Sequence, residues 1–371
     1  MSDTAYPTLQ HYGTAAQRAA FTPSPAAGTQ PIYIWYETDT GLTYLYHTAW
    51  VAISGGGSVT TPVPSGRLTL TTAVPYLVSS VTAATTIYYS PAVGNMVPLY
   101  NGTSFVPTSF SEVSQTTTDN TKSPAAVANN SNYDMFVWSD SGTIRCTRGP
   151  AWTSDTARGA GAGTTELVRT NGILLNNVSI TNGPAASRGT YVGTVRSNGS
   201  AQIDFIVGGA GGAGGEGTIL GIWNYYNQRY IALVNFDNTN SWTYTTLTWR
   251  LKNAGASTEL NKIKFICGFQ MNGISAQNYA LSSNTNASVA NQVAIGLDST
   301  SVIAIGSSTS RNFNPTAAAT FGHSATYSGM MPLGFHYLAP LEESAATGTT
   351  TWLGDNGGTD FYSLFNAQTM F

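Results

Sequence analysis

The chain has 371 residues, of which only 9% are charged, and its formal net charge is −3. Soluble domains usually carry about 25% charged residues, so much of this surface is expected to be uncharged or covered by other copies of the chain. A weakly acidic chain also lacks the positive surface that phosphate contacts require, which argues against a nucleic-acid partner. Small polar residues, 20 Tyr and 8 Trp favour strands and turns over helices.

The cysteines and the first residues bear on where the protein is made. Cys146 and Cys267 each stand in a strand-like run, which predicts two buried free thiols and no disulfide framework. The segment from Met1 to Gln10 lacks the features of a signal peptide, and no stretch reaches the ~18 apolar residues of a membrane span. We therefore expect synthesis and assembly in a cytoplasm, without membrane insertion.

The N-terminal region predicts one helix and one hairpin. The Ala-rich segment Leu9–Phe21 predicts a short helix that Pro23 and Pro25 end. Residues 31–53 predict a β-hairpin with a turn at residues 39–41 and an aromatic stripe along the strands. A lone hairpin is marginally stable in water, so we expect its aromatic stripe to contact a partner surface.

A linker separates this region from the remainder. Residues 54–58 read Ser-Gly-Gly-Gly-Ser, and the segment stiffens at Pro62 and Pro64. We predict an N-terminal attachment segment at 1–57, a linker at 58–66 and a body at 67–371.

The body shows short runs of β-branched and aromatic residues separated by turn residues. This pattern predicts a mainly β protein in which the short N-terminal hairpin precedes an antiparallel β-sandwich or jelly-roll-like body, and it argues against βαβ units. The expected strands are 68–70, 87–89, 96–100, 133–138, 144–147, 167–169, 173–180, 191–195, 203–207, 219–226, 230–236, 242–251, 263–269, 293–297, 302–305 and 335–338.

Several of these runs resemble segments of structural proteins from tailed bacteriophage virions, of the fibre or adhesin type. The N-terminal runs are similar to the short hairpin module near the ends of such proteins, and the later runs look like the larger β module that often follows it. The runs that carry the resemblance are 35–41, 44–46 and 49–51, then 67–71, 84–89 and 99–106, and further on 188–194 and 241–245.

The resemblance implies a non-enzymatic tail fibre or receptor-binding component located in the virion. It implies self-association as a homo-oligomer, with a trimer as the family expectation, and partners among other phage structural proteins and host surface glycans. Docking onto the virion is expected through Tyr33, Trp35, Tyr44, Tyr46 and Trp50. One alternative is a head or tail decoration protein without receptor binding, and another is a tailspike that depolymerises glycans.

The sequence predicts neither a cofactor site nor a metal site. Residues 209–214 match G-x-G-x-x-G, but a dinucleotide site needs a helix next, and the following Thr218–Trp223 has a strand pattern. A flexible loop or close-packed turn is the expected structure. The four histidines lack the close spacing that is typical of zinc ligands. They are His11, His47, His323 and His336.

Glycan hydrolysis would require two carboxyl groups about 5 to 9.5 Å apart. No spacing in the sequence selects one such pair. Turns exposed to solvent and surface ion pairs account for the acidic residues of the chain, so no catalytic residue is expected. The candidates are Asp134, Asp140, Asp204, Glu216, Asp237, Asp298, Glu342 and Glu343.

One run is suited to binding a glycan without cleaving it. Residues 223–230 interleave aromatic side chains with amides and one guanidinium, and aromatic rings stack on sugar faces while amides bond hydroxyls. Core packing or a subunit contact is the alternative explanation. The candidate contact residues are Trp223, Tyr225, Tyr226, Arg229 and Tyr230.

Overall fold

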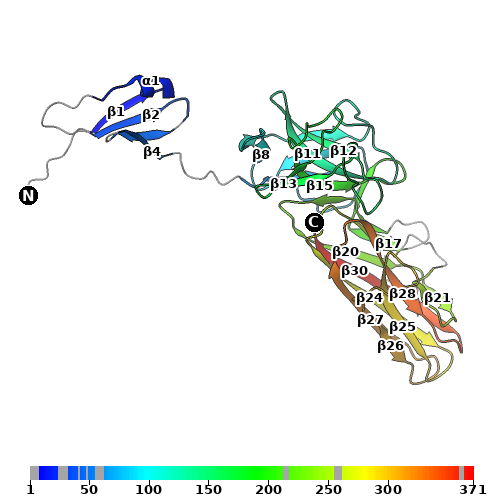
Figure 1. Ribbon diagram of the computed structural model, residues 1–371. Coiled ribbons are helices and arrows are strands. Elements are labelled where there is room, and N and C mark those ends of the chain that lie inside the picture. Colours follow the sequence, from blue (N-terminus) through cyan, green and yellow to red (C-terminus); the bar gives the residue numbers. More distant parts are fainter. Residues whose placement is uncertain are drawn as a thin grey trace, which may run out of the picture. The chain divides into compact units, whose positions relative to one another are not determined.

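The computed structural model describes residues 8–23, 32–40, 42–46, 49–54, 62–211, 217–254, 261–358 and 363–371. This part is almost entirely β, as predicted, and its one α-helix is α1 (Ala15–Ala20) (Figure 1). No helix in it has the length and apolar character needed to cross a membrane. The chain divides into two compact units, Met1–Thr61 and Pro62–Phe371. This boundary falls within the segment 58–66, of which residues 58–61 lie outside the described part.

The N-terminal unit is a four-stranded sheet with α1 beside it. The sheet has the order β1 (Thr8–Gly13), β2 (Ile32–Glu37), β3 (Thr43–Tyr46), β4 (Trp50–Ser54). Strands β2, β3 and β4 pair antiparallel, whereas β1 pairs parallel to β2. Strand β1 occupies residues predicted as helix, so the expected helix over Leu9–Phe21 is wrong in its first half. The backbone of β1 pairs with that of β2, which overrides local helix propensity.

A capping box sets the start of α1. Thr14 accepts a hydrogen bond from the Gln17 backbone N–H at 3.3 Å, and the Gln17 side chain accepts one from the Thr14 N–H at 2.8 Å. Asp39 accepts a third from the Ala15 N–H at 3.0 Å. These bonds satisfy helix N–H groups that otherwise lack partners. An ion pair of 2.6 Å between Arg18 and Glu37 then ties the helix to β2.

The first half of the body contains three small sheets. A 3-stranded sheet has the order β10 (Val113–Thr116), β7 (Thr86–Pro91), β5 (Gly66–Thr69), and β8 (Met96–Tyr100) pairs with β9 (Phe105–Ser109). A 6-stranded sheet has the order β12 (Thr143–Ala151), β11 (Asn132–Asp140), β15 (Thr190–Arg196), β14 (Ile173–Asn176), β13 (Leu167–Thr170), with β19 (Ile222–Asn224) paired to β15.

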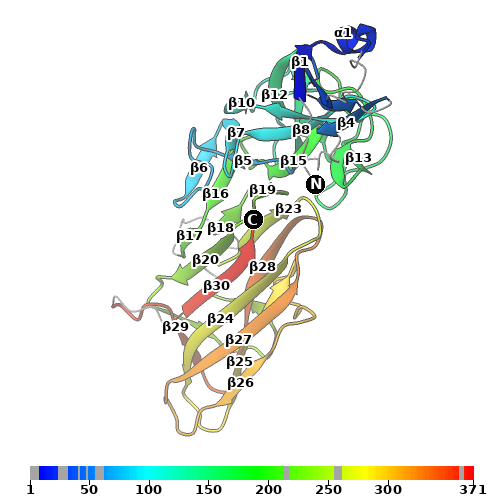
Figure 2. The same ribbon diagram turned by 90° about the vertical axis from the view of Figure 1, so that its left-hand side faces the viewer.

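The second half of the body is built from two larger sheets (Figure 2). The 8-stranded sheet has the order β26 (Ser310–Phe313), β25 (Ala290–Leu297), β28 (Gly334–Glu343), β23 (Ile263–Cys267), β18 (Thr218–Leu220), β16 (Ile203–Ile206), β6 (Val81–Ala84), with β22 (Arg250–Leu251) paired to β28. The 7-stranded sheet has the order β17 (Gly208–Gly211), β20 (Tyr230–Asp237), β30 (Ser363–Met370), β24 (Gly273–Asn284), β29 (Thr350–Leu353), β21 (Ser241–Tyr244), with β27 (Phe321–Met330) paired to β24.

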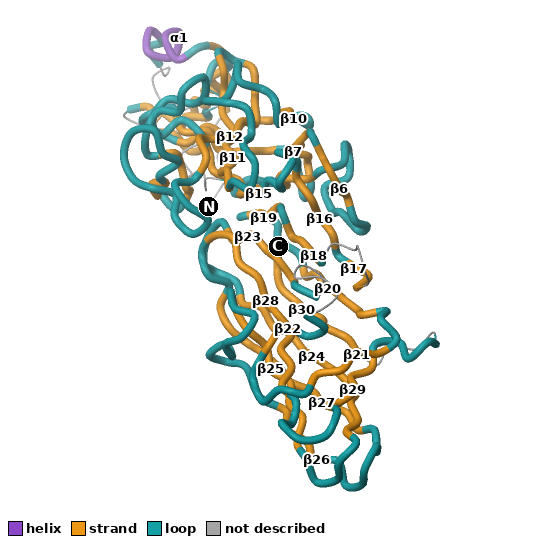
Figure 3. The backbone as a smooth tube through the Cα atoms, turned by 90° about the vertical axis from the view of Figure 1, so that its right-hand side faces the viewer, coloured by secondary structure: helices purple, strands orange, loops and turns teal. Residues whose placement is uncertain are grey.

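The body departs from a purely antiparallel arrangement at two places. Strand β17 pairs parallel to β20, and β18 pairs parallel to β23. Parallel neighbours need a long crossover connection, and between β18 and β23 the chain contributes β19, β20 and β21 to other sheets and β22 to the same sheet. Figure 3 shows strands through most of the body, joined by turns and loops.

One continuous hydrophobic core runs through both halves of the body. It extends from Leu68 near the start of the body to Phe371, whose ring stacks on Phe205 at 5.1 Å between centroids. The predicted free thiols are confirmed, because Cys146 and Cys267 are both buried and unbridged. The body therefore folds as one unit around a shared interior.

Not every predicted strand is present in the structure, and the glycine run is followed by a strand as predicted. Residues 302–305 form no strand, and the run 242–251 is divided by a turn into β21 and β22. The glycine run begins as strand β17, its residues 212–216 lie outside the described part, and the next element is strand β18. A strand in that position confirms that the phosphate-binding helix of a dinucleotide fold is missing from the described segment after the glycines.

The strand β24 shows why the two larger sheets face each other. Its side chains alternate strictly, so that one row is buried while the intervening row is more exposed. The buried row includes Asn278, Ser282 and Asn284 besides apolar residues. Asn278 and Ser282 bond groups of the opposite sheet, as between Asn291 of β25 and Ser282 at 3.0 Å, whereas Asn284 bonds Thr350 of the neighbouring strand β29 at 2.8 Å. The interior of this sandwich is therefore partly polar.

His323 of β27 belongs to this interior. Its Nε2 lies 2.8 Å from the Ser282 hydroxyl, and its ring packs on Trp352 with centroids 5.3 Å apart. Burial lowers the pKa of His323 to about 4. Protonation of the ring is therefore much less favourable in the folded than in the unfolded protein.

We expect acid to destabilise the body through His323. Because its folded pKa lies below the ordinary value of 6.5, its contribution is fully present above pH 6.5 and is lost as the pH falls towards about 4. The loss amounts to about 3 kcal/mol in the free energy of unfolding. Urea unfolding at several pH values in this window measures it, with His323→Asn as the comparison. An equal acid dependence in that variant would contradict the assignment.

Candidate ligand-binding site

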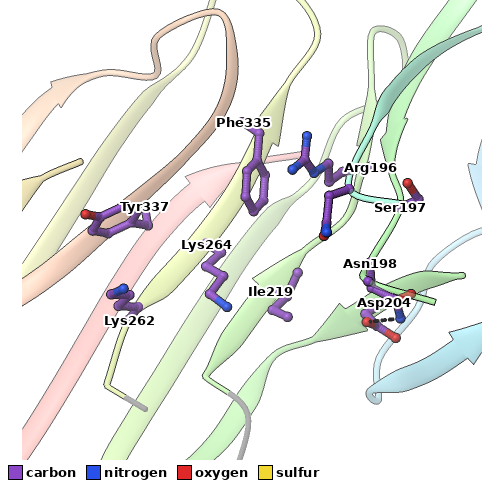
Figure 4. A pocket seen from close by; sticks show the side chains of 11 residues that line it. Arg196, Ser197, Asn198, Asp204, Ile219, Lys262, Lys264, Phe335 and Tyr337 are labelled. Carbon is purple, nitrogen blue, oxygen red and sulfur yellow. Dashed lines mark hydrogen bonds between the residues drawn. The ribbon is translucent and has the colours of Figure 1, made fainter. Parts of the chain in front are cut away.

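A pocket of about 400 Å³ opens in the body beside the strands β18, β23 and β28 (Figure 4). The end of β15 and the turn that follows it form the opposite wall. The lining residues are Asn130, Arg196, Ser197, Asn198, Gly199, Asp204, Ile219, Lys262, Lys264, Phe335 and Tyr337. They come from both halves of the body, so the pocket exists only in the folded unit.

Strand alternation places the side chains on the floor of the pocket. Ile219 lies opposite Lys264 in the β18–β23 pairing, and Lys264 lies opposite Tyr337 in the β23–β28 pairing. Side chains two residues apart on a strand share a face, so Lys262 joins Lys264, and Phe335 joins Tyr337. The intervening residues of β23 and β28 point into the core instead.

Aromatic rings hold two of the three cations of the pocket. The Lys262 ammonium lies 4.6 Å from the centre of the Tyr337 ring, and the Arg196 guanidinium lies 4.3 Å from that of Phe335. Such contacts are attractive because the face of a ring is electron-rich. Arg196 also pairs with Asp155 and donates to Asn132 at 3.1 Å, which fixes its position.

The polar wall of the pocket is rigid. The Asn198 side chain donates to Asp204 at 2.7 Å, the bond drawn in Figure 4, and its oxygen accepts from the Ser200 and Gln202 N–H groups. Asp204 also accepts from the Ala83 N–H at 2.7 Å. The carboxylate is thus held by fixed donors, and the turn keeps its amide and hydroxyl groups in place at the edge of the pocket.

The charge of the lining differs from that of the whole chain. Three lining residues are basic and one is acidic, although acidic residues outnumber basic ones in the sequence by 18 to 15. Two of the chain's four lysines, Lys262 and Lys264, lie here. Aromatic faces beside ammonium groups and amides suit an anionic ligand with a flat apolar side.

The aromatic residues predicted for docking form the interior face of the N-terminal unit. Tyr33 and Trp35 are buried, whereas Tyr44, Tyr46 and Trp50 are half-buried. All of these rings except Tyr44 pack in one cluster with two further rings, so that Trp35 lies 5.6 Å from His11 and 5.4 Å from Phe21 between centroids. The Tyr44 ring instead lies against the Arg18 guanidinium, 3.8 Å from its centre. Packing within the unit thus covers Tyr33 and Trp35, for which the sequence predicted contact with a partner surface.

The opposite face of the same sheet carries the exposed apolar side chains of this unit. Tyr12 and Tyr36 lie side by side there, with centroids 5.9 Å apart and exposed fractions of 69% and 43%. Val51 of β4 is 59% exposed. These residues were missed because β1 was predicted as helix, which hid the alternation of Tyr12.

The run predicted for glycan contact does not form one surface. Trp223 has no exposed surface, which corrects the prediction for this residue, because a fully enclosed ring cannot stack on a sugar. Tyr225 and Tyr226 are half-buried and pack edge to face, and the Arg229 guanidinium donates to the Leu77 carbonyl. Tyr230 is exposed but lies on β20, where its hydroxyl bonds Gln368.

The candidate carboxylates have structural partners. Asp134 is completely buried, pairs with Arg158 at 2.6 Å and accepts from Thr165 and Thr194. Asp298 bonds His336 at 2.6 Å, and Asp140 pairs with Lys122 and Arg145. Glu216 lies outside the described residues. In the described ranges, no group of three or more metal-ligating side chains gathers.

The pocket residues lie far apart in the chain, so the sequence alone does not predict the pocket. A signal for them exists: Lys262-Ile263-Lys264 and Phe335-His336-Tyr337 both alternate with the period of a strand. Lysine is scarce in this chain, and two of its four lysines stand at this spacing. The pairing that brings the two runs together is not visible in the sequence.

No family model and no curated protein matches this chain. Among solved structures, the mosquito-larvicidal Cry4Aa toxin from Bacillus thuringiensis aligns with 76% of this chain and 48% of its own, at 9% identity and a TM-score of 0.19. An exo-β-1,3-galactanase from Phanerochaete chrysosporium aligns with 92% of this chain and 68% of its own, at 12% identity and a TM-score of 0.10. The chain thus spans about half the length of the toxin. Likenesses this small carry no argument about fold or function.

We expect Trp35→Ala to unfold the N-terminal unit within the intact chain. Removing a large buried aromatic side chain costs about 3–5 kcal/mol, and a unit of this size has little stability to lose. Limited proteolysis should then cut within residues 1–61 and leave the body whole. The control is Tyr36→Ala on the exposed face, which should keep the wild-type pattern. Equal sensitivity of both variants would show that the aromatic cluster is not the core of this unit.

Proposed function

We propose that this chain is a non-enzymatic structural component of a bacteriophage tail, a fibre-like receptor-binding protein that acts in the virion as a homo-oligomer. In this proposal the N-terminal unit attaches to the particle, and the body presents the pocket to an acidic glycan on the host surface. The resemblance of the N-terminal and body segments to virion proteins supports the class. The pocket around Lys264 and Tyr337 supports the ligand chemistry.

The single observation that carries the ligand assignment is the row formed by Ile219, Lys264 and Tyr337 on three adjoining strands. An acidic sugar offers a carboxylate, hydroxyl groups and an apolar ring face. An ammonium group binds the carboxylate, an amide binds hydroxyls and an aromatic ring stacks on the sugar face. All three kinds of group line this pocket together.

The lining of the pocket supports binding more than cleavage. Glycoside hydrolysis normally uses two carboxyl groups on either side of the scissile bond. Asp204 is the one acidic side chain among the described residues of the lining, and hydrogen bonds from Asn198 and Ala83 hold it. The geometry therefore favours a receptor-binding role over the depolymerase alternative.

We expect Lys264→Glu to abolish most of the binding to acidic oligosaccharides. A hydrogen bond to a charged group contributes about 1.5–3 kcal/mol, so the dissociation constant should rise about tenfold or more. Binding should also weaken with added salt, because the interaction is electrostatic. Surface plasmon resonance with immobilised oligomers of sialic, glucuronic and galacturonic acid measures both effects.

The matched control is Arg311→Glu, which changes the net charge equally at an exposed site outside the pocket. It should retain wild-type affinity. Neutral glucose oligomers should not bind either variant or the wild type. Loss of affinity in the Arg311 variant as well would indicate a general charge effect and would remove the pocket from the proposal.

Deleting residues 1–61 should leave a folded body that no longer joins phage particles. Residues 1–61 form one compact unit and the body forms the other, so the deletion removes a whole unit and leaves the body complete. Immunoblots of gradient-purified particles with an antibody against residues 67–371 measure incorporation. Circular dichroism of the truncated protein checks its fold. Normal incorporation of a folded, truncated chain would refute attachment through the N-terminal unit.

A further inference from the structure

A fully buried lysine meets a fully buried asparagine between the two large sheets of the body. Lys252 follows β22 and Asn278 lies in the inward row of β24. Their exposed fractions are 1% and 0%. The Lys252 Nζ lies 3.0 Å from the Asn278 Oδ1 and 3.4 Å from the Tyr279 carbonyl oxygen. The amine is thus held directly against a side-chain amide in a site closed to water.

The Asn278 side chain is fixed on its other side. Its Nδ2 donates to the carbonyl oxygens of Ala294 at 2.9 Å and Leu341 at 3.1 Å. These two bonds set which end of the amide faces Lys252. The carbonyl end meets the amine, and the NH₂ end points towards backbone acceptors.

Two buried carboxyl groups act on Lys252. The charges of Asp237 and Glu342 both raise the pKa of its ammonium group, but burial outweighs them and lowers it to about 8. Burial also raises the pKa of Glu342, against the opposing effect of Arg250. Asp237 is held by Asn253 and Asn261 at 2.8 and 3.2 Å. A desolvated lysine loses its proton more readily and becomes a nucleophile.

We propose that Lys252 and Asn278 react with each other to form an intramolecular isopeptide bond. A bond forms between the Lys252 Nζ and the Asn278 Cγ, and the bond between Cγ and Nδ2 breaks. One proton passes from the neutral amine at Nζ to Nδ2, with the buried carboxylates as the nearby groups that relay it, and the nitrogen leaves as ammonia. No oxidant or cofactor is needed, because no atom changes its oxidation state.

The structure favours this reaction over a simple hydrogen bond in two respects. The Lys252 Nζ already lies 3.0 Å from the Oδ1 that is bonded to the reacting Cγ, which reduces the entropic cost of bringing the two groups together. Both side chains are almost completely buried, so solvent water has little access to compete with the amine for Cγ. The product would join the β22 end of one sheet to β24 of the facing sheet. It would supply the covalent link that Cys146 and Cys267, both unbridged, do not.

The test is the mass of the purified full-length protein under denaturing conditions. We expect a mass lower than that of the sequence by one ammonia molecule. Trypsin should then release the peptide 251–262, uncut after Lys252, joined to the peptide 265–311 that contains Asn278. A protein with the full sequence mass and with separate, unlinked peptides would overturn the proposal.

Variants exclude other routes to the same mass loss. Asn-Gly sequences such as Asn101-Gly102 can also lose ammonia by forming a succinimide, which hydroxylamine opens, whereas an isopeptide bond resists it. Lys252→Met replaces the amine with an apolar chain of similar length and should restore the full mass. Asn278→Asp should link with loss of water instead of ammonia. A mass deficit that persists in the Lys252 variant would contradict the assignment.

Discussion

The pairing of β23 with β28 determines both the core and the pocket of the body. Its register places Ile263 opposite Leu338 and Lys264 opposite Tyr337. The first pair faces the hydrophobic core, and the second faces the pocket. A slip of one residue would exchange the two faces of a strand, burying the lysines and exposing the core. Stability and binding therefore depend on the same hydrogen-bonded ladder.

The few charges of this chain are concentrated where strands from distant segments meet. Arg67, in the first strand of the body, is almost fully buried and donates to the carbonyl oxygens of Asn227 and Phe371 at 2.7 and 2.9 Å. Arg158 instead forms an ion pair with the buried Asp134 at 2.6 Å. Buried charges need partners in defined positions. They therefore specify the arrangement of sheets that apolar packing alone would leave less defined.

The alternation of apolar and polar residues along short runs made the β class and most strands of the body predictable from sequence. The strand-like runs around Cys146 and Cys267 made the buried free thiols predictable as well. Three features depend on pairing between distant segments and were not predictable. Strand β1 needs β2 beside it, the pocket needs β15, β23 and β28 together, and Trp223 is enclosed by strands from both halves of the body. Aromatic character alone does not distinguish a core ring from a binding ring. Trp223, predicted to contact a glycan, and Tyr33 and Trp35, predicted to dock onto the virion, are buried inside their own units.

The central claim is that the pocket beside β23 and β28 binds an acidic ligand. Lysine acylation with mass-spectrometric readout tests it directly, because the four lysines lie in different environments. A saturating sialic, glucuronic or galacturonic acid oligomer should slow the acylation of Lys264 and leave that of Lys122, outside the pocket, unchanged. Unchanged acylation of Lys264, or equal protection of both lysines, would contradict the account.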